Sequence, residues 1–100
     1  HDHDHEDFDS IVVALDEVES PEILCARIEA MAKVQNILRV KGYAAVKNKP
    51  MRLLVQAVGS RVRAQYDRPW TPDEQRSGKI VVIAEHDDVV RDAIETALKG

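Results

Sequence analysis

The chain has 100 residues, of which 44% are hydrophobic and 32% charged, and its formal net charge is -4 at pH 7. This length and composition predict one globular domain and leave no room for a second hydrophobic core. No apolar stretch is long enough to span a bilayer and no secretory signal opens the chain, so we expect a cytoplasmic location.

The chain opens with HDHDHEDFD, a segment dominated by charge, so we expect residues 1–9 to form a flexible arm. In an extended chain, alternate residues project to the same side at a spacing of about 7 Å, so the three histidines can converge on one divalent cation. The expected ligands are His1, His3, His5, Asp2 and Asp4. Imidazole and carboxylate suit zinc, cobalt, nickel and copper alike. A purification tag and an inert acidic tail are the alternative interpretations.

The folded domain is expected over residues 10–100, and it begins with the β-branched strand SIVVAL. Ser20 and Pro21 then predict a helix start, with serine as N-cap and proline at the first helical position. The helix is expected to run to about Lys33. Its apolar stripe comprises Leu24, Ile28 and Met31, with Cys25 beside it as a small core residue. Because Cys25 is the only cysteine, an internal disulfide is excluded.

Alternation in LRVKGYAAV and MRLLVQAV, separated by the turn NKP, predicts an antiparallel hairpin over residues 38–58. One face of this hairpin is apolar, and the other carries Arg39, Lys41 and Tyr43. RVRAQY alternates again and DRPWTPDEQRSG is expected to be a loop. KIVVIA is apolar on both faces, which predicts the most buried strand.

A final helix is expected, capped by Asp87 or Asp88 and ending at Gly100. Its apolar stripe is Val90, Ala93, Ile94, Ala97 and Leu98. In condensed form the predicted element order is strand, helix, three strands, helix. We therefore expect an α+β fold, a mainly antiparallel sheet with two helices packed on one face and the basic residues on the other.

Charge is strongly segregated along the chain. Residues 1–22 contain nine carboxylates and no lysine or arginine, whereas residues 39–68 contain eight basic residues and one acid, Asp67. This asymmetry indicates two surfaces with different partners, or one surface that the acidic segment can lie against. A solvated polar face is the alternative.

The sequence lacks the usual signatures of an enzyme. It has no glycine-rich phosphate loop, no recognisable nucleophile motif and no Cys-x-x-Cys pair. We therefore expect no catalysis by this chain alone. A basic sheet face with a tyrosine could bind single-stranded nucleic acid, which is the alternative function. Trp70 is more typical of a rim residue that seals a core, and His86 of an exposed loop residue.

The histidine-rich arm running into FDSIVVAL, followed by LRVKGYAAV, MRLLVQAVGSR, YDRPW and KIVVIA, resembles the C-terminal domain of the CobW family over essentially the whole chain. Proteins of this family join an N-terminal P-loop GTPase domain to this smaller domain, often through a histidine-rich segment. They are regarded as metal chaperones or insertases. CobW itself is tied to cobalt handling in cobalamin biosynthesis, and relatives serve zinc homeostasis and nitrile hydratase maturation.

The resemblance implies a non-catalytic regulatory and partner-binding domain of a GTP-dependent metal chaperone that delivers cobalt for cobalamin biosynthesis. The arm would then be the end of an interdomain linker that holds cobalt or zinc loosely, and GTP would bind only to the GTPase domain outside this chain. The implied partners are that GTPase domain and a client metalloprotein or metal chelatase. The residues expected to contact a partner are Arg39, Lys41, Tyr43, Arg52 and Trp70.

Overall fold

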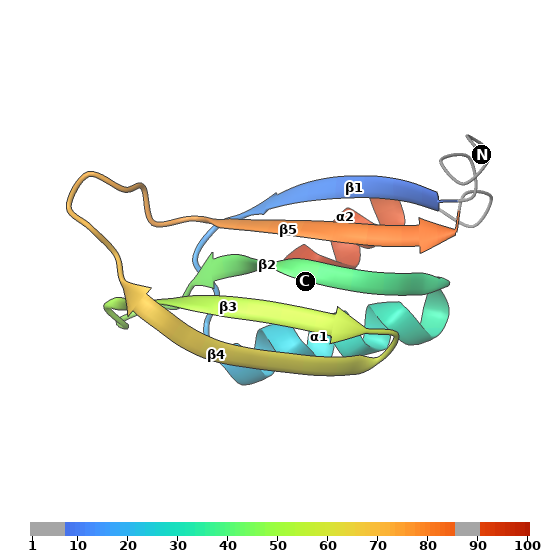
Figure 1. Cartoon of the computed structure of the whole chain (residues 1–100), viewed down its shortest axis with the longest axis horizontal. Helices are drawn as coiled ribbons and strands as arrows, with labels where there is room; N and C mark the ends of the chain where they lie inside the picture. Colours follow the sequence, from blue (N-terminus) through green and yellow to red (C-terminus); the bar gives the residue numbers. More distant parts are fainter. Residues whose placement is uncertain (1–7, 86–90) are drawn as a thin grey trace.

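A computed structural model describes residues 8–85 and 91–100. These residues form a five-stranded antiparallel sheet with two helices behind it (Figure 1). The elements are β1 (Phe8–Leu15), α1 (Pro21–Val34), β2 (Ile37–Ala45), β3 (Met51–Val58), β4 (Arg61–Pro69), β5 (Gly78–Glu85) and α2 (Arg91–Lys99). The strands lie in the order β1-β5-β2-β3-β4. The predicted α+β class, the antiparallel sheet and the placement of both helices on one face are confirmed.

The predicted element order is wrong in one count. It placed three strands between the helices, whereas the structure has four, β2 to β5. The four segments LRVKGYAAV, MRLLVQAV, RVRAQY and KIVVIA each form a strand of their own. In the sheet, β5 lies between β1 and β2 and not beside β4. β1 begins at Phe8, two residues before the predicted strand.

Helix α1 follows the sequence prediction closely. The Ser20 hydroxyl accepts a hydrogen bond from the Ile23 amide at 3.2 Å, and Pro21 occupies the first helical turn. Leu24, Ile28 and Met31 are buried against the sheet. The apolar stripe and the serine cap together determine where this helix starts and which side faces the core.

Helix α2 buries Ile94 and Leu98 completely. Gly100 has a φ of 85°, and its amide donates to the Thr96 carbonyl at 3.0 Å, which confirms the predicted glycine at the end of the helix. The predicted caps Asp87 and Asp88, together with Val90 and His86, lie outside the described residues. Neither α1 nor α2, the helices in the described part of the chain, has the length and hydrophobicity needed to cross a bilayer.

Strand β5 lies inside the sheet, between β1 and β2, but only one of its faces is buried. Ile80, Val82 and Ala84 are buried beneath the helices. Val81 and Ile83 point to the other face and are only half-buried. The strand is apolar on both faces, as the sequence indicates, but only one face is covered, because both helices pack on the same side and no other described element covers the opposite side.

Gly42 allows β2 and β5 to approach closely. A Cβ atom at this position would lie 2.2 Å from the Lys79 carbonyl oxygen and 2.8 Å from the Ile80 Cα. Backbone atoms cannot move away cheaply, so no side chain fits here. Gly42, which the alternation places among apolar residues, is therefore required for the close approach of β2 and β5.

The N-cap of α1 gives a direct test of this description. Replacing Ser20 by alanine removes the acceptor for the Ile23 amide, and we expect a loss of about 1 kcal/mol in the free energy of unfolding. Urea denaturation measures this loss. Ser60→Ala is the matched control, because Ser60 lies in the β3–β4 turn without a side-chain hydrogen bond among the described residues. Equal losses in the two variants would contradict the role of Ser20 as a cap.

Candidate partner-binding surface

The candidate metal ligands of the arm fall outside the part of the chain that the structure describes. They are His1, Asp2, His3, Asp4 and His5. Within residues 8–85 and 91–100, no group of three histidine, cysteine, aspartate or glutamate side chains is placed to hold a metal ion. Metal binding by the arm therefore stays a prediction.

Cys25 lies at the edge of the α1 stripe and is half-buried. Burial raises the pKa of its thiol, and the nearby Glu22 and Glu29 carboxylates raise it further. A raised pKa reduces the thiolate fraction, which is the form that attacks electrophiles or binds metal. This environment suits a packing residue better than a reactive one.

The face of the sheet opposite the helices, which we call the open face, is where the candidate partner-binding residues lie. The strand register aligns its side chains in rows that run across the sheet. The first row is Val12, Val81, Lys41, Gln56 and Arg63. The second row is Ser10, Ile83, Arg39, Val58 and Arg61. The third row is Ala14, Lys79, Tyr43, Leu54 and Gln65.

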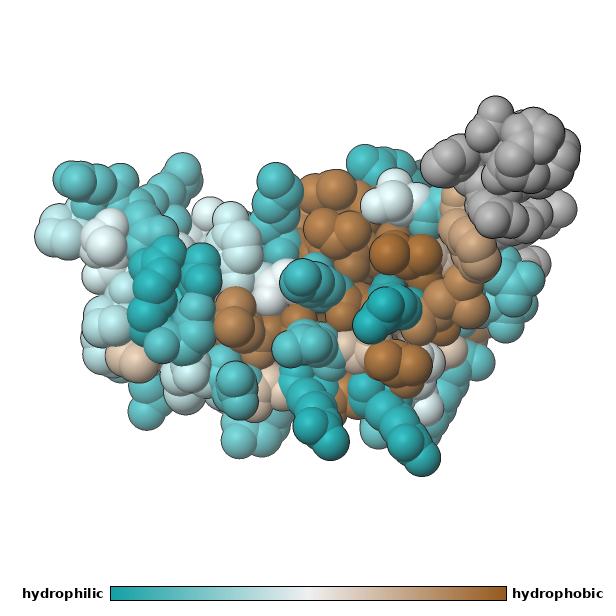
Figure 2. All heavy atoms as spheres, viewed as in Figure 1, coloured by the Kyte–Doolittle hydropathy of each residue, from teal (hydrophilic) through white to brown (hydrophobic). Residues whose placement is uncertain are grey.

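Much of the open face is apolar, which the sequence analysis did not predict. Figure 2 shows hydrophobic side chains gathered over β1, β5 and β2, with hydrophilic side chains among and below them. Phe8 is 47% exposed, Val12 43% and Val58 61%. The signal is present in the sequence, since KIVVIA is apolar on both faces, but an apolar pattern does not indicate whether a face is covered. The open face is therefore amphipathic, with basic residues and Tyr43 as expected and an unexpected apolar patch.

Among the described residues, the basic side chains at the centre of this face form no ion pair. Arg39 and Lys41 project from β2, between the apolar side chains of β5 and those of β3. Neither forms an ion pair or hydrogen bond through its side chain with any residue in 8–85 or 91–100, and the same holds for Lys79, Arg61 and Arg63. These five cations are therefore available to a partner.

A shallow groove of about 320 Å³ lies over β2 on this face. It is lined by Arg39, Val40, Lys41, Gln56, Ala57, Val58, Val81 and Ile83. We call it the β2 groove. It combines the two unpaired cations of β2 with apolar walls from β5 and β3, so a ligand that fills it must match both kinds of chemistry.

Tyr43, Arg52 and Trp70 come together at the other end of the open face. The Tyr43 and Trp70 rings meet edge to face with centroids 6.2 Å apart, and the Arg52 guanidinium lies 5.2 Å from the Tyr43 ring centroid. Arg52 also forms a bidentate ion pair with Asp67, with N···O distances of 3.2 and 2.5 Å. The hydrogen bond from Arg52 lowers the pKa of Asp67. Arg52 is thus already paired, and the ring faces are partly occupied.

Trp70 is held by a loop that has its own ion pair. Arg68 binds both carboxylate oxygens of Glu74, at 2.7 and 2.6 Å, and the Thr71 amide donates to the same carboxylate at 2.9 Å. These hydrogen bonds lower the pKa of Glu74 to about 2. The Arg76 guanidinium lies 5.9 Å from the Trp70 ring centroid. The indole Nε1 has no hydrogen-bond partner among the described residues. This arrangement agrees with a rim residue more than with a ligand platform.

The acidic and basic segments of the chain do meet, but not on the open face. Glu19 pairs with Lys47 at 2.6 Å, and Glu17 pairs with Arg76 at 2.7 Å. Both pairs lie where loops connect the ends of strands, and the hydrogen bond from Lys47 lowers the pKa of Glu19. The acids of residues 16–22 therefore leave Arg39 and Lys41 unneutralised.

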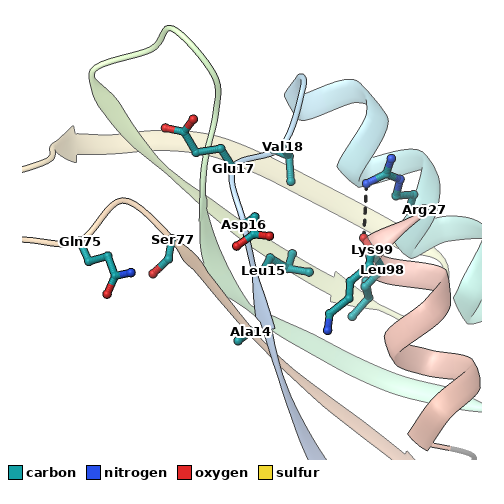
Figure 3. Close-up of a pocket in the computed structure, with 10 residues that line it drawn as sticks. All are labelled: Ala14, Leu15, Asp16, Glu17, Val18, Arg27, Gln75, Ser77, Leu98 and Lys99. Carbon is teal, nitrogen blue, oxygen red and sulfur yellow. Dashed lines mark hydrogen bonds between the residues drawn. The ribbon is translucent and has the colours of Figure 1, made fainter.

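A larger hollow of about 560 Å³ lies beside the end of β1, between the loops and the end of α2 (Figure 3). Two of its charged side chains are already engaged. Arg27 donates to the Leu98 carbonyl at 3.4 Å, and Glu17 pairs with Arg76. No candidate residue from the sequence lines this hollow, and its internal bonding suits a structural role.

Comparison with known proteins places the whole described chain in one family. The model of the cobalamin synthesis protein CobW C-terminal domain matches residues 8–100. The chain is 46% identical over 85 residues to a zinc chaperone CobW of Sinorhizobium, covering 85% of this chain and 24% of that protein. It is 48% identical over 91 residues to a zinc chaperone CobW of Pseudomonas aeruginosa, covering 89% of this chain and 24% of that protein. The chain thus spans about a quarter of the length of these curated relatives.

Solved structures agree with this match. The Zn(II)-bound YjiA GTPase from E. coli superposes with a TM-score of 0.74 at 30% identity, over 94% of this chain and 29% of that one. A Zn(II)-bound triple mutant of YjiA GTPase gives a TM-score of 0.72 at 31% identity, over 94% of this chain and 30% of that one. The fold described above is therefore that of one part of a larger protein in these relatives.

The Arg68–Glu74 pair predicts a pH dependence of stability. Because the folded-state pKa of Glu74, about 2, is below its ordinary value of 4.5, the pair stabilises the fold above pH 4.5 and is lost as the pH falls toward 2. We therefore expect Glu74→Gln to lower the melting temperature at pH 7, by a small amount because the pair is exposed, and to have no effect near pH 2.

Thermal unfolding followed by circular dichroism at pH 7, 4 and 2 makes this measurement. Asp73→Asn is the matched control, since Asp73 forms no ion pair among the described residues. A melting-temperature difference between wild type and Glu74→Gln that stays constant from pH 7 to pH 2 would rule out this contribution of the pair.

Proposed function

Because the chain belongs to the CobW C-terminal domain family, we propose that it is the non-catalytic, partner-binding domain of a GTP-dependent metal chaperone. The observation that carries the proposal is the open face, where five cations that form no ion pair with the described residues lie beside exposed apolar side chains. A surface of this kind suits recognition, because no described part of the chain covers its apolar side chains or neutralises its cations. A GTP-dependent chaperone draws on the cytoplasmic GTP pool, so the cytoplasm is the proposed location.

The cargo of this chaperone is a divalent metal that the arm would collect. The ligands would be His1, His3 and His5, with Asp2 and Asp4. Neutral imidazole with carboxylate accepts zinc and cobalt alike, and such a set on an extended segment would bind loosely and exchange quickly. The relatives are named zinc chaperones, which supports zinc, whereas the resemblance to CobW proteins led us to expect cobalt for cobalamin biosynthesis.

The partner proposed for the open face is the GTPase domain of the same protein or a client metalloprotein. Arg39 and Lys41 would make the contact, because they are the central cations of this face without an ion-pair partner in the described chain. Tyr43, Arg52 and Trp70 would form the edge of the contact. Arg52 contributes less charge than expected, because Asp67 already neutralises it.

The metal proposal predicts the behaviour of a triple variant. Replacing His1, His3 and His5 by alanine leaves only carboxylates in the arm, and we expect the apparent affinity for zinc and for cobalt to fall by about tenfold or more. Competition with a chromophoric chelator measures both affinities.

His86→Ala is the matched control, because it removes the one histidine outside the arm. Unchanged metal affinity in the triple variant, or an equal loss in the control, would exclude the arm as the collecting site. The ratio of the zinc and cobalt affinities decides which cargo the arm favours.

The docking proposal predicts the effect of charge reversal. We expect Arg39→Glu with Lys41→Glu to reduce capture of the remaining three-quarters of the Pseudomonas aeruginosa relative by about tenfold. The reason is that the substitutions replace two cations by carboxylates, which repel a partner surface complementary to the cations. A pull-down with GTP or GDP present measures capture. Lys33→Glu with Lys99→Glu, on the two helices, is the control with the same change in net charge.

Retained capture by the Arg39/Lys41 variant would exclude the open face as the docking site. Nucleic-acid binding is tested in parallel with a fluorescent oligonucleotide. Salt-sensitive binding that needs Arg39 and Lys41, together with no capture of the relative, would favour the nucleic-acid function instead.

A further inference from the structure

The chemistry of the open face restricts what can lie on it. The rows bring an apolar strip on β1 and β5, formed by Val12, Val81 and Ile83, beside the cations Arg39 and Lys41 of β2. Neighbouring strands are about 4.8 Å apart. Any element that covers the apolar strip therefore also removes water from Arg39 and Lys41.

The two cations decide the charge of the partner. Burying a charged side chain without an opposite charge is costly, so a neutral apolar partner is rejected. Two copies of this chain meeting through their open faces would place cations against cations, which is also unfavourable. A partner that brings carboxylates next to its own apolar side chains satisfies both parts of the surface.

The geometry of a sheet face decides the structure of the partner. The hydrogen-bonding groups of a sheet point along its plane, so an added strand pairs at an edge and not on a face. A segment lying on the face must satisfy its own backbone groups, as a helix does. The helices α1 and α2 already do this on the opposite face. A helix about 10 Å across also reaches from β5 to β2.

We propose that the open face binds an acidic amphipathic helix of a partner protein, with its apolar stripe on Val12, Val81 and Ile83 and its flanking carboxylates on Arg39 and Lys41. The bound helix completes a layer on the uncovered side of the sheet. Nucleic acid fits this surface less well, because phosphates would pair with the cations but leave the apolar strip exposed. Tyr43, the one aromatic ring of the central rows, already contacts Trp70 and Arg52.

This inference deepens the partner-binding role proposed above and rests on it. The test uses the 100-residue chain with synthetic peptides and needs neither metal nor a GTPase domain. A negative result here therefore leaves the metal and docking results standing, and failure of the metal experiment does not affect this one.

The probe is a peptide of about 14 residues, roughly 21 Å long as a helix, with leucines at helical spacing and glutamates at the flanking positions. Its matched control carries glutamine in place of every glutamate. We expect the glutamate peptide to bind at least about tenfold more tightly, since its carboxylates pair with the two cations. Amide chemical shifts of the chain should change on β5 and β2, and titration of these shifts measures the affinity.

Charge exchange gives the most specific result. The variant Arg39→Glu with Lys41→Glu should lose binding to the glutamate peptide by about tenfold and gain binding to a peptide with lysine in place of glutamate. Lys33→Glu, on the helix side, should leave both affinities unchanged. If the double variant does not fold, as judged by amide shift dispersion, the single variant Lys41→Gln should bind the glutamate peptide more weakly than the wild-type chain does.

Four outcomes would overturn the proposal. They are equal affinity for the glutamate and glutamine peptides, shift changes confined to α1 and α2, tighter binding of a 12-nucleotide single strand at Arg39 and Lys41, and self-association of the chain that buries the same face. The last two would identify nucleic acid or a second copy as the occupant.

Discussion

Both helices bury their apolar stripes on one face of the sheet, and the organisation of the molecule depends on this one-sided packing. Leu24 and Ile28 of α1 and Ile94 and Leu98 of α2 are all fully buried there. The inward residues of β1, β2, β3 and β5 complete this apolar core, which contains no buried polar or charged side chain among the described residues. Since burial of apolar area is the main stabilising contribution to folding, the helices and the covered face form one unit.

The same packing leaves the second face of the sheet without a covering element in the described chain. An uncovered antiparallel sheet usually alternates apolar and polar residues along each strand. Here β2 follows that pattern with Arg39 and Lys41, but β5 does not, because Val81 and Ile83 lie on the open face. Half-buried β-branched side chains next to cations without a counter-ion among the described residues are poorly explained by stability alone. They are well explained by a surface that is covered when the protein meets its partner.

The two ends of the open face differ in how far their charges are neutralised. At the Trp70 end, Arg52 and Arg68 are held by Asp67 and Glu74. At the β2 groove, Arg39 and Lys41 have no counter-ion within the described residues. The charges at the first end are neutralised internally, whereas the second end presents charge that the described residues do not neutralise. The match covers about a quarter of each curated relative. The rest of such a protein is long enough to supply the partner for this charge.

Local patterns in the sequence determined most of the fold: the Ser20 cap, the stripe of α1, the β2–β3 hairpin and the terminal glycine each follow from short-range chemistry. They also determined which residues could form a basic face, including Arg39 and Lys41. Only the tertiary structure decided that β5 inserts between β1 and β2, that Arg52 is paired with Asp67, and that Val81 and Ile83 lie half-buried on the uncovered face. The physical reason is that alternation assigns a residue to a face, while long-range packing alone decides whether that face is covered and which strands share it.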